Sequence, residues 1–196
     1  MLRRHHFFLW GKCAFFYYGM EDIMKQQMNS RKLALSGMFL ALALVMPFLT
    51  GQIPQIGSML CPMHFPVLLC GFFCGGPMGL MVGIIAPIFR SMLFGMPPMF
   101  PVAVCMAAEL AVYGLVAGVF YRRLPRKKWA VYVSLLCAMI LGRLAWGAAM
   151  RLCVGVNFGL AAFLAGAVTT ALPGIVLQLI LLPVLVIAME RYIEWK

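Results

Sequence analysis

The feature that most constrains this sequence is the stretch from Leu33 to Phe89, which contains no Lys, Arg, Asp or Glu. At about 20 residues per membrane crossing, this stretch holds two full transmembrane helices and most of a third. The composition agrees, because 64% of the 196 residues are hydrophobic and only 11% are charged, whereas a soluble domain is roughly half apolar. The sequence therefore predicts an all-α integral membrane protein and excludes a water-soluble fold.

Proline, glycine and charged residues divide the chain into six apolar segments, of which the second is short and the sixth is long. They cover residues 33–49, 62–75, 78–95, 101–121, 129–150 and 160–190. We expect one helix from each segment, and hence a bundle of six transmembrane helices in a single domain, residues 28–196. Residues 1–27 form an extension with a broken apolar run. We interpret this extension as an overextended gene start or, alternatively, as a cytoplasmic amphipathic tail.

The basic residues gather in three clusters at the ends of apolar segments: Arg31-Lys32, Arg122 to Lys128, and Arg191 to Lys196. With the amino terminus inside, all three clusters fall on the cytoplasmic side, and Arg151 falls at the outer edge. The sequence thus predicts that both termini are cytoplasmic. The net charge of +11 reflects this topology and does not indicate a nucleic-acid partner.

Three ionisable residues lie inside predicted helices, where charge is costly and usually faces the bundle interior. Arg90, Glu109 and Arg143 all fall in the outer half of the membrane, with Glu109 about 12 Å below the outer end of its helix at 1.5 Å per residue. Arg143 could simply neutralise Glu109. With Arg151 included, however, arginines exceed carboxylates in this half, and a planar guanidinium suits a carboxylate ligand.

Further polar and aromatic residues are candidates for the same site. Trp146 follows Arg143 at i+3 and shares one helical face with it, which is typical either of a pocket wall or of a helix packing face. The amides of Gln52, Gln55 and Asn157 lie in predicted outer loops, and the loop at residues 50–61 could act as a lid. His64, at the start of a helix, is a further candidate ligand or, alternatively, an interfacial histidine.

Motifs for catalysis are missing from the sequence. It contains no G-x-x-x-x-G-K-[ST] phosphate loop, no H-E-x-x-H and no G-x-S-x-G, and its seven cysteines form no C-x-x-C pair. We therefore predict that the chain is not an enzyme and holds no metal and no cofactor. ATP hydrolysis would have to come from another subunit.

The first apolar segment carries a pair of small residues, Gly37 and Ala41, at i and i+4. Such a pair lets helices approach closely. The spacing alone leaves open whether the partner helix belongs to this chain or to another protein.

Several runs resemble a known family. They are Pro62 to Phe72, Gly79 to Gly83, Arg90 to Pro98, and Glu109 to Gly114. These runs are similar to the substrate-specific S components of energy-coupling factor (ECF) transporters, within that family most of all to the pantothenate or hydroxymethylpyrimidine type.

The resemblance implies a six-helix subunit that binds a small-molecule vitamin or vitamin precursor near its outer face. It also implies docking onto a transmembrane T component that carries two ATPase subunits, with Gly37-xxx-Ala41 standing where the family has Ala-xxx-Ala. Three other hypotheses remain open at this point. They are an intramembrane enzyme acting on a lipid through Glu109 or His64, an uptake subunit for a neutral pyrimidine precursor, and an assembly partner without a ligand.

Overall fold

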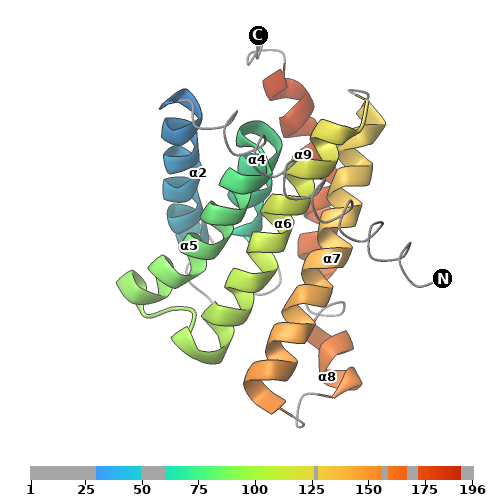
Figure 1. Cartoon of the computed structure of the whole chain (residues 1–196). Helices are drawn as coiled ribbons and strands as arrows, with labels where there is room; N and C mark the ends of the chain where they lie inside the picture. The colour runs from blue at the N-terminus through green and yellow to red at the C-terminus, as the bar shows by residue number, and fades with distance from the viewer. Residues whose placement is uncertain (1–29, 50–60, 126–127, 156–158, 167–171, 191–196) are drawn as a thin grey trace, which may run out of the picture.

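The computed structural model describes residues 30–49, 61–125, 128–155, 159–166 and 172–190, and every regular element in these ranges is helical (Figure 1). The elements in chain order are α2 (Ser30–Leu49), α4 (His64–Cys74), α5 (Gly76–Phe94), the π-helical turn η1 (Met99–Ala103), α6 (Val104–Arg123), α7 (Lys128–Val154), α8 (Leu160–Leu164) and α9 (Leu172–Glu190).

Five helices in the described part of the chain are long and apolar enough to cross a membrane: α2, α5, α6 together with η1, α7 and α9. The chain is thus a membrane protein with several apolar helices. The helix α4 has 11 residues, which at 1.5 Å per residue cover roughly half of a hydrocarbon core about 30 Å thick. A bundle of six full transmembrane helices therefore stays a prediction, since the second predicted segment forms only this short helix.

The prediction of one long helix over residues 160–190 was wrong. The structure places the short α8 at Leu160–Leu164 and begins α9 only at Leu172. Apolar composition fixes where a chain can lie in a membrane, but it does not show where one helix ends and another begins.

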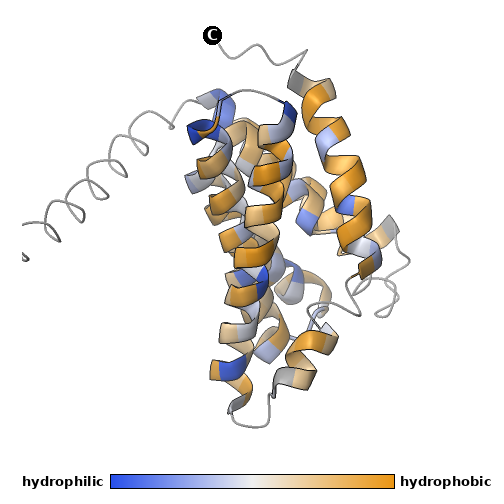
Figure 2. Cartoon of the chain, turned by 90° about the vertical axis from the view of Figure 1, so that its right-hand side faces the viewer, coloured by the Kyte–Doolittle hydropathy of each residue, from blue (hydrophilic) through white to orange (hydrophobic). Residues whose placement is uncertain are grey.

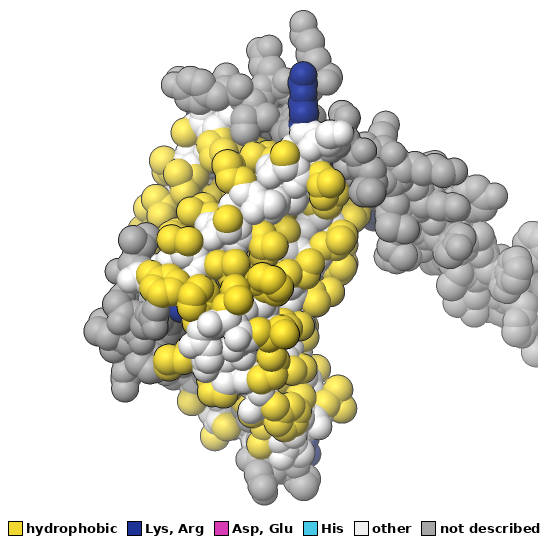
Figure 3. Space-filling view, turned by 90° about the vertical axis from the view of Figure 1, so that its left-hand side faces the viewer, with side chains coloured by type: hydrophobic (Ala, Val, Ile, Leu, Met, Phe, Trp, Pro, Cys, Tyr) yellow, Lys and Arg dark blue, Asp and Glu magenta, His cyan; other side chains and the backbone are white. Residues whose placement is uncertain are grey.

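The outer surface of the bundle is apolar, as a lipid-facing surface requires. Figure 3 shows the side of the molecule that carries α2 and α5, which is covered almost entirely by hydrophobic side chains. Large exposed side chains of these two helices include Leu42 and Val45 on α2 and Met81, Ile84 and Phe89 on α5. In Figure 2 the hydrophilic positions gather mainly at one end of the bundle and at a few places along its length.

The short α4 lies at the centre of the bundle, and each of its residues is buried. It packs against α2, α5, α6 and α9. Glycines bring its neighbours into backbone contact: a Cβ atom on Gly114 of α6 would clash with the backbone of Gly79 on α5. At the far end of α4, the Arg122 guanidinium donates a 3.1 Å hydrogen bond to the Cys74 carbonyl.

The described basic clusters lie at one end of the bundle. Arg31 and Lys32 are in the first turn of α2, Arg122 and Arg123 end α6, and Lys128 begins α7. These helix ends lie together at the top of Figure 1, while α7 runs to the opposite end. The arrangement matches the charge pattern expected of a cytoplasmic face, and the cytoplasmic location of the termini stays a prediction.

Candidate functional site

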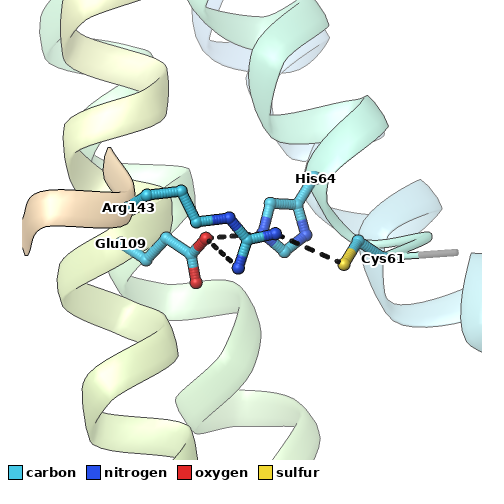
Figure 4. Close-up of polar contacts among 4 residues, drawn as sticks. All are labelled: Cys61, His64, Glu109 and Arg143. Carbon is cyan, nitrogen blue, oxygen red and sulfur yellow. Dashed lines mark hydrogen bonds and ion pairs between the residues drawn. The ribbon is translucent and has the colours of Figure 1, made fainter. Parts of the chain in front are cut away.

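Four polar side chains from three parts of the chain meet inside the bundle (Figure 4). Glu109 comes from the second turn of α6 and Arg143 from α7, which packs along it. His64 is the first residue of α4, and Cys61 precedes that helix. We call these four residues the polar cluster. Two long helices and the start of the central helix therefore fix its geometry.

Glu109 is the centre of the polar cluster. Its Oε1 lies 3.1 Å from Nη1 of Arg143 and 3.4 Å from Nε2 of His64. The side chains of Glu109 and His64 are each only 3% exposed, and that of Arg143 is 15% exposed. A carboxylate buried this deeply requires a compensating positive charge. Arg143 thus neutralises Glu109, which is one of the two arrangements that the sequence left open.

The polar cluster retains unused hydrogen-bonding capacity. Nδ1 of His64 and Nε of Arg143 are buried and have no hydrogen-bond partner among the described residues. Nearly all buried polar atoms in proteins are satisfied by protein, water or ligand. Because Glu109 and Arg143 carry opposite charges, these atoms can bind a polar, uncharged group without leaving a net charge buried.

Two members of this region were missed by the sequence analysis. The sulfur atom of Cys61 lies 3.9 Å from Nη2 of Arg143. Burial raises the pKa of the Cys61 thiol above the usual range, so this thiol is protonated at neutral pH. Tyr113 is 1% exposed and packs edge-on against His64, with ring centroids 5.1 Å apart. In the sequence, the spacing of four residues between Glu109 and Tyr113 was the signal that both lie on one face of a helix.

His64 lies inside the bundle rather than on its lipid-facing surface. Its side chain is buried beside Glu109 and Tyr113. The position of His64 in the sequence suggested an interface because it begins an apolar segment. That segment forms the short, central α4, so its first residue lies inside the bundle.

Arg90 forms a second polar feature, held by α2 and by the end of its own helix. Its Nη1 donates a 2.7 Å hydrogen bond to the Leu44 carbonyl. Its guanidinium carbon lies 5.1 Å from the ring centre of Phe48 and 5.4 Å from that of Phe94. The residue is only 4% exposed, and it has no ion pair with a carboxylate in the described part of the chain.

The remaining candidates fall elsewhere. Trp146 stacks on Phe163 of α8, with ring centroids 6.3 Å apart, and a Cβ on Gly147 would clash with the same Phe163 ring. This face of α7 is thus in contact with α8, as the packing interpretation expected. Gln52, Gln55 and Asn157 lie outside the described residues.

A comparison with family models gives a match over residues 31–186 to the ECF transporter, substrate-specific component. This match covers most of the chain and includes Arg90 and the whole polar cluster. The chain belongs to this family. No curated protein and no solved structure matches the chain in the corresponding comparisons.

Membership of the ECF substrate-specific components assigns the chain to a transporter subunit rather than to a family of enzymes. It does not identify the substrate, because members of one fold differ in what they bind. The two residues expected to face a partner, Gly37 and Ala41, lie on an exposed face of α2. An added Cβ on Gly37 would meet no atom within 4 Å.

Proposed function

We propose that this protein captures an organic anion of the vitamin class at the outer face of the bacterial cytoplasmic membrane, with pantothenate as the leading candidate. It then delivers the substrate inward together with a transmembrane T component and two ATPase subunits. The family match supports the role of substrate-binding subunit. The vitamin and the partners are inferred from the residues and from the resemblance described above.

The observation that carries the choice of an anion is the difference between the two buried arginines. Arg143 has a carboxylate partner at 3.1 Å, whereas Arg90 is surrounded by a carbonyl and two aromatic rings. A carbonyl and aromatic faces stabilise a cation only partly. The fork of N–H groups on Arg90 therefore suits a ligand carboxylate, which would complete its charge balance.

The polar cluster supports the proposal in a different way. Its unpartnered atoms, Nδ1 of His64 and Nε of Arg143, suit hydroxyl or amide groups because the local ion pair is already neutral. We propose that these groups contact the uncharged part of the substrate. Gln52, Gln55 and Asn157 remain candidate contacts from the loops, and Trp146 remains a candidate through its helix.

The test is a comparison of an acid with its alcohol. Purified wild-type protein and the Arg90→Gln variant are titrated with pantothenate and with the alcohol in which CH2OH replaces the carboxylate. Loss of a charge-assisted hydrogen bond costs about 1.5–3 kcal/mol, so we expect the variant to bind pantothenate roughly ten- to a hundredfold more weakly. The alcohol should bind the wild type weakly and lose little more in the variant.

Arg151→Gln is the matched control, because it removes one positive charge from the exposed end of α7. It should leave pantothenate affinity within about twofold, since an exposed charge contributes little. Equal binding of acid and alcohol to the wild type would contradict the anion site. A neutral ligand such as a pyrimidine precursor, held by the polar cluster, would then be the better assignment.

A further inference from the structure

Arg90 contacts two aromatic rings that come from different helices. Phe48 is the last residue but one of α2, and Phe94 is the last residue of α5. The guanidinium carbon of Arg90 lies over both rings, 5.1 Å from the centre of the Phe48 ring and 5.4 Å from that of Phe94. The two rings also contact each other edge-on, with centroids 4.9 Å apart. We call Phe48 and Phe94 the aromatic pair, because together they contact one guanidinium.

The aromatic pair lies at the apolar surface, and the arginine lies behind it. Both phenylalanines are exposed, whereas Arg90 is buried. A leucine at either position would also shield the guanidinium from lipid, so shielding alone does not require an aromatic ring. A ring adds two properties that leucine lacks, a face that attracts a cation and a flat, rigid contact surface.

The aromatic pair and the Leu44 carbonyl together orient the guanidinium of Arg90. Its Nη1 donates a 2.7 Å hydrogen bond to this carbonyl, which fixes one edge of the planar group. The rings attract the cation but offer it no oxygen or nitrogen acceptor. The other N–H groups of the fork thus have a fixed direction, and they suit a bidentate ligand such as a carboxylate.

We propose that Phe48 and Phe94 are positioning residues that set the preference of the Arg90 site for a carboxylate over an uncharged group. This inference rests on the proposed function, in which Arg90 binds the substrate carboxylate. The rings hold the guanidinium in its binding orientation before the ligand arrives, so less side-chain freedom is lost on binding. They also exclude water, which strengthens the charge-assisted hydrogen bonds to a carboxylate. An uncharged hydroxyl gains much less from either effect.

The first test is a titration with an acid and its alcohol. Purified full-length wild type, Phe48→Leu and Phe94→Leu are each titrated with pantothenate and with the alcohol in which CH2OH replaces the carboxylate. Loss of one ring lowers the fraction of Arg90 side chains in the binding orientation, so pantothenate should bind roughly three- to thirtyfold more weakly. Binding of the alcohol should hardly change, and the ratio of the two affinities should therefore fall.

Two kinds of control separate the effect of the rings from a general effect on structure. Phe48→Tyr and Phe94→Tyr keep the aromatic face, so they should keep the wild-type ratio of acid to alcohol affinity. Phe120→Leu removes a similarly exposed ring near the basic end of α6, and it should also leave this ratio unchanged. A variant with a distorted structure would bind acid and alcohol equally less well, which leaves the ratio near that of the wild type.

The second test needs no ligand. Protein labelled isotopically in its arginine side chains is examined by NMR, and the Nε–H signal of Arg90 is assigned by its absence from Arg90→Gln. Ring currents from the aromatic pair should shift this signal away from the signals of exposed arginines. The shift should shrink in Phe48→Leu and Phe94→Leu and persist in the two Tyr variants.

The results distinguish failure of this inference from failure of the proposed function. If the wild type prefers the acid and both Leu variants keep that preference in full, the inference is overturned and the proposed function stands. Equal binding of acid and alcohol to the wild type would overturn the proposed function, and the inference with it. An Arg90 signal that is unchanged in both Leu variants would show that the rings do not hold the guanidinium, which overturns the inference whatever the ligand.

Discussion

The buried carboxylate of Glu109 is the residue on which the interior of this protein depends most. It is the only acidic residue between Ile23 and Met189, so the sequence was sufficient to expect a basic partner for it. The structure assigns Arg143 to that role at 3.1 Å. The contacts of His64 and Cys61 could not be foreseen, because they depend on where the short α4 begins in space.

Replacing Glu109 with Gln should leave the Arg143 charge buried without a partner. Breaking a buried ion pair on one side costs about 3–5 kcal/mol, and we expect this loss in the free energy of unfolding, measured in mixed detergent micelles. The double variant Glu109→Gln/Arg143→Met removes the stranded charge and should recover much of the stability. If the two substitutions act additively, the ion pair does not have the role assigned to it here.

Among the helices, α4, α5 and α6 come into backbone contact with one another because glycines lie where they meet. The apolar segments that produce these helices could be located from the sequence to within a few residues. Which glycines face one another could not be predicted from the sequence, because the composition of each segment is nearly uniform and shows little helical periodicity. The contact of Gly114 with Gly79 is thus a result of the structure alone.

Gly114→Ala should destabilise the bundle by about 1–3 kcal/mol or more, because the added Cβ would meet backbone that cannot move aside. Gly37→Ala is the matched control, because a Cβ there meets nothing within 4 Å. It should be neutral or slightly stabilising, as alanine is the better helix former. Unfolding midpoints of the two variants decide between these outcomes. Similar midpoints would show that α5 and α6 do not approach as closely as described.

The exposed face of α2 carries Gly37 and Ala41, the two residues expected to contact the T component. We expect Gly37→Leu or Ala41→Leu to weaken co-purification of the T component while leaving substrate affinity unchanged, because a larger side chain prevents close helix approach. Ala148→Leu, at an exposed position of α7, is the control. It should reduce neither co-purification of the T component nor substrate affinity. A parallel loss of substrate binding and of co-purification would indicate that this face of α2 packs within the subunit.

For the molecule as a whole, composition and charge distribution were enough to predict an all-α membrane protein with basic residues at one end. The resemblance of residues 62–114 was enough to predict the family, which the match over residues 31–186 confirms. The surroundings of Arg90 could not be predicted, because Leu44 and Phe48 are distant in sequence and reach it only through the packing of α2 against α5. The anion site therefore depends on tertiary structure.

The most direct test of the central claim is mass spectrometry of the small molecules released when purified protein is denatured. The protein should be produced in cells supplied with a mixture of vitamins and purified without added ligand, with the Arg90→Gln variant treated in parallel. We predict that the wild type releases an organic acid of the vitamin class in a near-stoichiometric amount and that the variant releases far less. Release of lipid alone, or of equal amounts of an uncharged compound from both proteins, would contradict the account.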